Sequence, residues 1–562
     1  MSKKNDMLKA SFRLVKKVVN SNKYSKKVAR KAKGVVFRYV QNASQRELYN
    51  LSSYYPTIGE YYSQQKDVQP TDPLISILLP TYNTPETFLR ECIESILVQS
   101  YPNWELCIAD DNSSDKLVIK IIKEYMKKDK RIKLVERPQN GHISKATNSA
   151  LEIAKGEFVS LMDHDDVLWP NALYETVLAI RKNQKVDLIY SDEDKIDGTG
   201  KTHSYPFLKP NFSPEFLESC NYITHFSTIR KKLMNEIDGF RAGYEGAQDW
   251  DLFIRIGERT DQIVHLPKIL YSWRIHEAST ASDTDAKPYV YEAQRKLLED
   301  HIKRQGKLGK VTTGIIRQHR TIRYKIQKDS LLSVIINIKD ADKITKTIDA
   351  INNSSAGASF EVIFTHANQP LNDITAAVDV KIIKHNVKFE DISGSSVLVI
   401  NNEVLSLSDD WALLALADTQ IKGVAIVYPV LLKEDGATIR SAGLGIGYGP
   451  SGIINMLENM PLQDDHYTRG LYAKSRRNVS AGSNSVYAVK KELYFTAFND
   501  GRDGVDAAVD SLSKGYRHVY TPYIQASVSN TSVYESDKYT NHIDSYLNQN
   551  FNKTNGRMEV KA

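Results

Sequence analysis

Acidic residues are crowded into one short stretch of the chain, directly after an apolar run. The segment SLMDHDDVLWP, residues 160–170, places Asp163, Asp165 and Asp166 within four consecutive positions. Carboxylates this close repel one another and raise each other's pKa unless a positive charge compensates them. The stretch is therefore either a solvated turn or a cation site. Its Asp-x-Asp pair offers the hard oxygen ligands that suit Mg²⁺ or Mn²⁺.

Alternating apolar and amphipathic segments predict the sheet that would carry these acids. We expect strands at 74–80, 104–111 and 132–136, helices at 85–100, 116–128 and 143–155, and a further strand from 157 that ends at the acidic stretch. This alternation predicts an α/β fold in which a mostly parallel sheet has helices on both faces. Ligands of such sheets bind beyond the carboxyl ends of the strands, where Asp111 and residues 163–166 are expected.

Two later motifs add further candidates for chemistry. EGAQDWDLFIRI (245–256) opens a helix with Asp249 and Asp251, and YSWRIHEASTAS (271–282) places His276 after a predicted strand. Asp251 can pair with Arg255 four residues further along the helix. Asp249 is therefore the better candidate for a carboxylate that accepts a proton.

Seven motifs, in order, resemble the family 2 glycosyltransferases. They are ISILLPTYN, CIADDNS, GHISKATNSALEIAKGEFVSLMDHDD, YSDEDKID, FLKPNFSP, EGAQDWDL and YSWRIHEAST, within residues 74–282. The variant with GHIS, DHDD and YSDED is similar to bacterial enzymes that build O-antigen, capsule and cell-wall polysaccharide. The resemblance implies the GT-A fold, in which a nucleotide-binding α/β sheet is joined to an acceptor-binding half.

The resemblance also implies roles for individual residues. Asp249 matches the general base of the inverting members, and Asp163, Asp165 and His276 match positions that hold Mn²⁺ or Mg²⁺. The positions expected to bind the nucleotide-sugar donor are Pro80, Thr81, Tyr82, Asp111, Lys145, Asn148, Asp163, Asp192 and Asp194. Many members carry an arginine where this chain has Thr147, so Lys145 is the candidate for that charge.

Structural explanations compete with several of these roles. Asp165 or Asp166 could cap a helix that begins near Pro170. Residues 192–194 could form an exposed strand end, and His276 could be a solvated loop residue.

The second half of the chain repeats the first in order, although weakly in identity. Residues 332–340 match 75–83, 360–368 match 104–112, 395–404 match the strand before the acidic stretch, and 515–524 match 261–270. The chemistry is lost, because Ala367 replaces Asp111, Glu403 replaces the metal-binding acid and Gly504, beside Asp503, replaces Asp249. No histidine corresponds to His276. We predict a duplicated domain that is not catalytic.

A basic segment precedes the repeats. Thirteen Lys or Arg against Asp6 give residues 1–40 a charge of +12, so the rest of the chain, in a protein of net charge +7, sums to −5. Apolar residues recur at helical spacing between these basic residues, which predicts an amphipathic helix on an anionic membrane surface. A solvated or nucleic-acid-binding arm is the alternative, but nothing in the remainder favours nucleic acid.

The predicted organisation has five parts: a basic helical segment (1–53), a linker (54–73), a catalytic domain (74–325), a degenerate domain (326–540) and a polar tail (541–562). Three scattered cysteines exclude a disulfide framework, and no apolar run of membrane-spanning length or signal peptide is present. We expect an inverting, metal-dependent transferase on the cytoplasmic face of the plasma membrane, acting on a lipid-linked glycan. A bifunctional enzyme and a non-catalytic scaffold are the alternatives, and the oligomeric state is not predicted.

Overall fold

The computed structural model describes residues 55–276, 288–365, 379–383, 386–498, 504–531, 534 and 537–559. The predicted basic helical segment therefore lies outside the described residues. The chain divides into two compact units. Unit 1 comprises residues up to 206, 225–235 and 268–282, and unit 2 comprises 207–224, 236–267 and 283 onward. The first repeat is thus distributed over both units, whereas the second lies wholly in unit 2.

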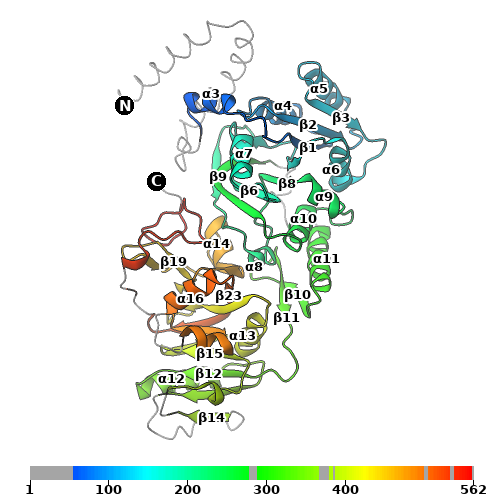
Figure 1. Cartoon of the computed structure of the whole chain (residues 1–562). Helices are drawn as coiled ribbons and strands as arrows, with labels where there is room; N and C mark the ends of the chain where they lie inside the picture. The colour runs from blue at the N-terminus through cyan, green and yellow to red at the C-terminus, as the bar shows by residue number, and fades with distance from the viewer. Residues whose placement is uncertain are drawn as a thin grey trace. The chain divides into compact units, whose positions relative to one another are not determined.

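In the described part of the chain, the first repeat contains nine strands. They are β1 (Ile75–Thr81), β2 (Trp104–Asp110), β3 (Ile132–Glu136), β4 (Phe158–Leu161), β5 (Val167–Leu168), β6 (Leu188–Asp197), β7 (His203–Phe207), β8 (Ser227–Arg230) and β9 (Ile263–Ile275). Its helices are α3 (Ile58–Lys66), α4 (Glu86–Leu97), α5 (Lys116–Met126), α6 (His142–Ile153), α7 (Ala172–Lys182), α8 (Pro214–Leu217), α9 (Lys231–Glu236), α10 (Gln248–Gly257) and α11 (Pro288–Arg304). Figure 1 labels several of the strands, including β1, β2 and β3. The strands and helices predicted between residues 74 and 161 are all confirmed, with ends shifted by at most a few residues.

The first sheet has the strand order β3-β2-β1-β4-β8-β6-β9-β5, with β7 paired to β6. Strands β1 to β4 run parallel, and β8 pairs antiparallel with both β4 and β6. Every residue of β1 and β2 is buried, as the continuous apolar runs predict for a sheet covered on both faces. The parallel strands bring the ends of β1, β2 and β4 to one edge, where the predicted acids follow.

The second repeat forms a sheet of the same topology. Its eight principal strands are β12 (Leu332–Ile336), β13 (Phe360–Phe364), β14 (Asp379–Ile382), β15 (Ser396–Ile400), β16 (Val404–Leu407), β17 (Val424–Leu432), β22 (Val486–Lys490) and β23 (Arg517–Val528). Their order, β14-β13-β12-β15-β22-β17-β23-β16, matches that of the first sheet strand for strand. The predicted duplication of the α/β fold is therefore confirmed at the level of topology.

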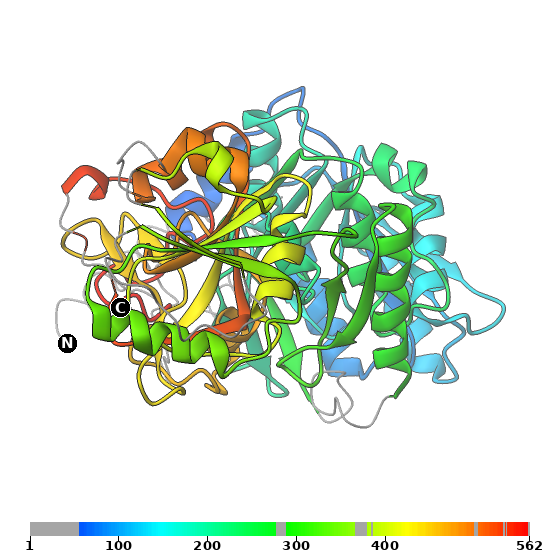
Figure 2. The same cartoon turned by 90° about the horizontal axis from the view of Figure 1, so that it is seen from below.

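The remaining elements complete this second domain. Its helices are α12 (Ala341–Asn352), α13 (Trp411–Thr419), α14 (Tyr467–Lys474), α15 (Lys491–Leu493) and α16 (Gly504–Ser513), and helices lie on both sides of its strands (Figure 2). The short strands are β10 (Gly309–Thr313) and β11 (Arg320–Tyr324) in the connection, then β18 (Ile439–Ser441), β19 (Leu444–Ile446), β20 (Ile453–Asn455) and β21 (Arg477–Asn478). Among the described residues, no helix combines the length and the apolar character needed to cross a bilayer.

A polar cluster at the amino-terminal ends of the parallel strands shows the duplication in atomic detail. In the first repeat Ser76 donates to buried Glu105 (2.7 Å) and accepts from the Gly156 N–H (2.8 Å). In the second, Ser333 donates to Glu361 and accepts from the Gly394 N–H (2.9 Å). A lysine pairs with the glutamate in both cases. Each glycine lies against backbone so closely that a Cβ would clash, at 2.5 Å and 2.6 Å from a carbonyl oxygen.

Residues described within the predicted polar tail, 541–562, pack against the second domain. Asp544, Asn548 and Phe551 are buried in unit 2. The Asp544 carboxylate accepts from the Ser480 hydroxyl (2.7 Å) and from the Ile446 N–H (3.0 Å). The polar composition of this segment therefore reflects side chains that satisfy the backbone of the second domain.

Candidate active site

The loop after β2 holds Asp111 in a fixed position. Asp110, its neighbour, accepts from the hydroxyls of Thr81 (3.1 Å) and Ser113 (2.6 Å), so it stabilises the loop itself. Asp111 is buried and accepts from Arg137 Nε (2.8 Å) and from the Gly141 N–H (3.0 Å). A carboxylate with these two partners is anchored at the carboxyl edge of the sheet.

The other residues predicted to bind the donor differ in accessibility. Pro80 and Thr81 are buried at the end of β1, whereas the Tyr82 side chain is 48% exposed. Lys145 is exposed on α6, and Asn148, one turn further along, is half-buried. Tyr82 and Lys145 are therefore the members of this set with accessible side chains.

The acidic stretch after β4 folds back on the end of β9. Asp166 is fully buried and accepts from the Tyr271 hydroxyl (2.6 Å) and from the Arg274 N–H (2.7 Å). Helix α7 begins only at Ala172, with Asn171 at the capping position. The interpretation of Asp165 or Asp166 as a helix cap is therefore wrong.

Two histidines face the other acids of the stretch. His276 Nε2 lies 2.8 Å from Asp165 Oδ2, which brings together two of the predicted metal-binding residues. His225 Nε2 lies 3.4 Å from Asp163 Oδ2, and its Nδ1 lies 3.5 Å from Glu193. The sequence analysis did not single out His225.

This cluster fits a divalent cation. One ligand atom each from Asp163, Asp166 and His225 lies within 4.8 Å of the other two. Carboxylate oxygens and imidazole nitrogens are ligands that Mn²⁺ accepts, and Mg²⁺ takes the carboxylates. Asp165 and His276 form a second pair of potential ligands in the same stretch.

The pKa values show how strongly these groups interact. Burial, reinforced by the charges of Asp165 and Asp163, raises the pKa of Asp166 well above its usual range. Burial disfavours the charged form of His225, but hydrogen bonds to Asp163 and Glu193 outweigh it and raise its pKa to about 10. Burial would also raise the pKa of Asp163, but His225 lowers it overall. Asp166 therefore favours its protonated form, and His225 compensates the charge of Asp163.

Strand β6 places its acids in the interior. Asp192, Glu193 and Asp194 are all buried, which excludes the exposed strand end. Asp194 Oδ2 lies 2.7 Å from His203 Nδ1, whereas Glu193 contacts His225 and, at 3.4 Å, Lys195. Successive residues of a strand point to opposite faces, so it is Glu193 that lies on the side of the acidic stretch.

Asp249 lies in unit 2, in the first turn of α10. Its carboxylate accepts from Asn221 Nδ2 (2.7 Å) and from the following backbone N–H of Trp250 (2.9 Å), and it is half-buried. Asp251, by contrast, is fully buried and pairs with Arg241 and with Arg255 Nε (2.9 Å). The predicted Asp251–Arg255 pair is confirmed, and Asp249 is the acid of this motif that lines a cavity.

Among the described residues, the corresponding positions of the second repeat carry no such cluster. Glu403 pairs with Lys346 Nζ at 3.0 Å, so a lysine supplies the positive charge there. Gly504 opens α16, and Ser529 and Asn530, rather than a histidine, follow β23, the strand that corresponds to β9. Ala367 and Asp503 lie outside the described residues.

Arg137 and His225 are the contacts that sequence reasoning missed. Arg137 directly follows β3, at the same edge of the sheet as Asp111, so its place after a predicted strand was a usable signal. His225 precedes β8, which pairs with β4 and β6, and its role depends on this long-range pairing. No local pattern around it indicates the contact.

Comparison with known proteins gives a consistent result. Residues 76–239 match the family described as glycosyl transferase family 2. An uncharacterized glycosyltransferase, MJ1057, of Methanocaldococcus jannaschii is 32% identical over 211 residues, which are 36% of this chain and 71% of that protein. The O-antigen biosynthesis protein RfbC of Myxococcus xanthus is 31% identical over 392 residues, 67% of this chain and 30% of that protein.

A further relative covers most of the chain. The uncharacterized protein y4gI of Sinorhizobium fredii is 33% identical over 486 residues, 81% of this chain and 52% of that protein. The chain thus spans about half the length, or less, of y4gI and RfbC. Among solved structures, TarS residues 1–349 of S. aureus in complex with UDP-GlcNAc is 24% identical, with a TM-score of 0.34 over 41% of this chain and 66% of that one.

Proposed function

Because this chain belongs to glycosyl transferase family 2, we propose that it is an inverting, divalent-metal-dependent glycosyltransferase that extends a bacterial surface polysaccharide. The donor is a nucleotide-diphospho-sugar and the acceptor a growing, lipid-linked glycan. The observation that carries the proposal is the acidic stretch after β4, where Asp163, Asp165 and Asp166 lie with His225 and His276 at the sheet edge that also holds Asp111.

On the donor side, Asp111 and the end of β1 receive the nucleoside. Asp111 is held by Arg137 and by the Gly141 N–H, so its oxygens are oriented before a ligand arrives. Asp163 and Asp165, with His276, would hold Mn²⁺ or Mg²⁺. A divalent cation at such a site neutralises the charge that develops on the departing diphosphate.

On the acceptor side, Asp249 takes the proton from the attacking hydroxyl. As the new bond forms at the anomeric carbon, the sugar–phosphate bond breaks and the nucleoside diphosphate leaves with its electron pair. The Asp249 carboxylate accepts the proton late in this step, when the hydroxyl is most acidic. Asn221 and the Trp250 N–H hold the carboxylate in one orientation for that transfer. Attack from the face opposite the leaving group inverts the anomeric centre.

The second domain is proposed to be non-catalytic, and the basic residues 1–40 to bind the protein to the inner face of the plasma membrane. The Glu403–Lys346 ion pair supports the first statement, because it fills the position of the acidic stretch with a balanced pair. The +12 charge of residues 1–40 supports the second, since basic residues near anionic headgroups favour binding.

Nucleoside diphosphate release from a panel of sugar nucleotides tests the proposal. We expect slow release from one donor with Mn²⁺ or Mg²⁺, its loss with chelator, and a decrease of about 100-fold or more in Asp165→Ala. Glu403→Gln is the matched change in the second repeat and should leave the rate unchanged. Release that survives Asp165→Ala would indicate a bifunctional enzyme, and donor binding without any release would indicate a scaffold.

A further inference from the structure

Unit 2 contains a cavity of about 500 Å³ beside Asp249. Three parts of the chain line it. The first repeat supplies Asn221, Asp249, Trp250 and Gln294, the connection supplies residues 315–319, and the second domain supplies residues 463–467, 470, 471 and 474. The second domain therefore forms one wall of the cavity that holds the proposed general base.

Three lining residues keep a buried polar atom without a hydrogen-bond partner among the described residues. They are Asn221 Oδ1, Gln294 Oε1 and His319 Nδ1. Buried polar groups in folded proteins are rarely unpaired, and a group left so usually awaits a ligand or water. The side-chain oxygens of Asn221 and Gln294 can only accept hydrogen bonds, so they call for donors on the ligand.

Asn221 has a specific role in this set. Asp249 can only accept, so the Asn221 amide nitrogen must be the atom that faces it, which fixes the amide oxygen on the other side. One residue thus orients the proposed base and leaves an acceptor oxygen beside it. An acceptor hydroxyl bound by Asn221 Oδ1 would be held next to the carboxylate that takes its proton.

The wall from the second domain adds an aromatic ring and further polar groups. Tyr467 opens α14, and its side chain is 40% exposed. Asp464 is held by Arg469 Nε at 3.0 Å and by the His466 N–H at 2.8 Å, so the loop before α14 is ordered. An accessible ring among fixed polar groups matches the alternation of apolar C–H faces and hydroxyls on a sugar.

Hydrogen bonds and ion pairs join the two walls within unit 2. Ser213 Oγ donates to Asn478 Oδ1 (2.7 Å), and Glu215 accepts from Arg517 (2.7 Å). Tyr472 of α14 donates to the Leu208 carbonyl (3.1 Å). Ser213 and Glu215 lie shortly before Asn221 in the chain, and Tyr472 lies in α14, so the contacts hold the segments that form the two walls.

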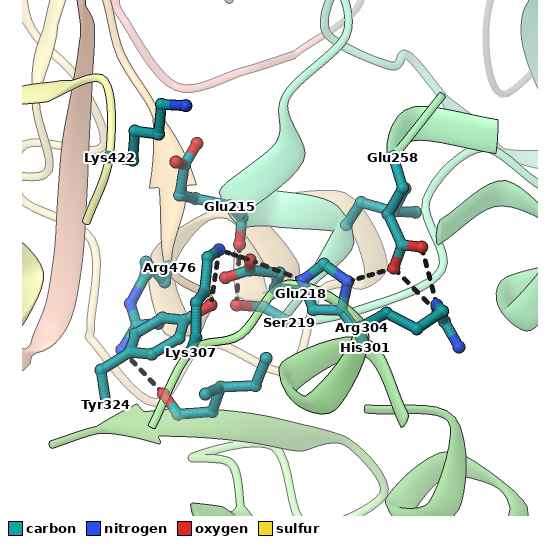
Figure 3. Close-up of polar contacts among 12 residues, drawn as sticks. Glu215, Glu218, Ser219, Glu258, His301, Arg304, Lys307, Tyr324, Lys422 and Arg476 are labelled. Carbon is teal, nitrogen blue, oxygen red and sulfur yellow. Dashed lines mark hydrogen bonds and ion pairs between the residues drawn. The ribbon is translucent and has the colours of Figure 1, made fainter. Parts of the chain in front are cut away.

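A buried charge network extends this attachment (Figure 3). Glu218, three residues before Asn221, contacts His301 (3.1 Å) and Lys307 (3.4 Å). Arg476, two residues after α14, is fully buried, and its Nη2 donates to the Ile322 carbonyl (3.0 Å) of β11. Both walls of the cavity are therefore adjacent in sequence to residues that ion pairs and hydrogen bonds fix in place.

We infer that this cavity is the acceptor site and that the second domain completes it, with a neutral, hydroxyl-rich sugar of the growing glycan as its ligand. The inference rests on the proposed function, since it gives the acceptor a place. The ligand is neutral rather than acidic because three carboxylates, of Asp249, Asp464 and Asp465, line the same space against two cations, Arg317 and Lys474. The duplicated domain would then recognise the acceptor instead of performing a second transfer.

Saturation-transfer NMR on the full chain tests this without any donor. The probes are the methyl glycosides of glucose, galactose, mannose, rhamnose and N-acetylglucosamine, with glucuronate as the acidic counterpart. We expect the wild type to bind at least one neutral glycoside and to bind glucuronate more weakly. Gln294→Leu and Tyr467→Ala should each weaken that binding about tenfold.

Phe389→Ala is the matched control for Tyr467→Ala, because Phe389 is 49% exposed in the second domain and does not line the cavity. Thermal unfolding of each variant reports its folding, and Gln294→Leu keeps the test decisive if Tyr467→Ala misfolds. Binding that is unchanged in both variants, preference for glucuronate, or no binding by the wild type would overturn the inference. Nucleoside diphosphate release is measured in the same samples. It tests the proposed transferase activity, whereas glycoside binding tests the acceptor site, so a failure of one can be told from a failure of the other.

Discussion

At the scale of single residues, the donor edge depends on how Asp111 is held. The carboxylate has two partners, Arg137 and the Gly141 N–H, and both must approach closely. Gly141 opens α6, where its missing side chain leaves room for the Arg137 guanidinium. A Cβ at this position would lie 2.6 Å from Arg137 Nη2 and 3.0 Å from Lys145 Cδ.

Gly141→Ala should therefore weaken binding of the nucleoside diphosphate about tenfold, because Arg137 must move away from Asp111 and a charged hydrogen bond is worth about 1.5–3 kcal/mol. Titration calorimetry with UDP, GDP, CDP and dTDP measures the effect. Gly59→Ala is the control, since no atom lies within 4 Å of a Cβ there. Equal affinity in Gly141→Ala and the wild type would show that Asp111 does not orient the nucleotide.

At the scale of elements, His301 links three helical segments through charge. It lies on α11 with one nitrogen 3.1 Å from Glu218, which follows α8, and the other 2.6 Å from Glu258, which follows α10. Burial disfavours its charge, but both glutamates raise its pKa overall. Lys307 and Arg304 provide the glutamates with additional positive charge.

The sign of the pH dependence follows from this shift. A raised pKa means that His301 stabilises the fold below its unfolded value, near 6.5, and that this stability is lost as the pH rises through the raised value. We expect His301→Gln to lower the free energy of unfolding by about 2 kcal/mol at pH 6 and by less at pH 9. Thermal unfolding between these pH values measures it, with His265→Gln as the control.

Other histidines limit how large the change can be. The pKa values of His203 and His225 are also raised, against the effect of burial, by Asp194 in one case and by Asp163 and Glu193 in the other. The variant should therefore flatten only part of the pH profile. A profile parallel to that of the wild type would mean that His301 is neutral in the folded protein.

Secondary structure was largely predictable because it depends on local patterns. Continuous apolar runs predicted β1, β2 and β4, and helical spacing predicted α4, α5 and α6. The same reasoning failed where tertiary contacts decide the outcome. His225 reaches Asp163 through the pairing of β8 with β4 and β6, and the buried Asp544 binds Ser480, 64 residues earlier in the chain.

Comparison of the two repeats shows which residues around the sheet occur in both and which occur only in the first. The cluster of Ser76, Glu105 and Gly156 in the first repeat recurs as Ser333, Glu361 and Gly394 in the second. The acids beyond the carboxyl ends of the strands do not recur. The described part of the second domain therefore keeps the packing of the first without the acids of its candidate site, which is why the order of motifs is recognisable although the identity is low.

At the scale of the whole molecule, the compact units cut across the repeats. Residues 207–224 and 236–267 belong to the transferase motifs in sequence but to unit 2 in the structure. Several of their buried polar groups bind residues far along the chain. Lys209 O accepts from Asn548 Nδ2 (2.9 Å), and Glu215, which is only 2% exposed, accepts from Arg517 at 2.7 Å.

A chain shortened to end at residue 330 should therefore fold poorly, although it keeps all seven transferase motifs. It would lose the Glu215–Arg517 ion pair and uncover the buried Phe216, whose ring lies 5.4 Å from that of Tyr472. Exposing a buried aromatic side chain costs about 1.5–3 kcal/mol. We expect little soluble protein and no cooperative thermal transition by circular dichroism. In the full chain, the double variant Glu215→Gln with Arg517→Met removes both charges together. It should lower the free energy of unfolding much less than the truncation does. A shortened chain that unfolds cooperatively at the full-length midpoint would show instead that the transferase half is independent, and that the second domain is attached to it rather than part of its fold.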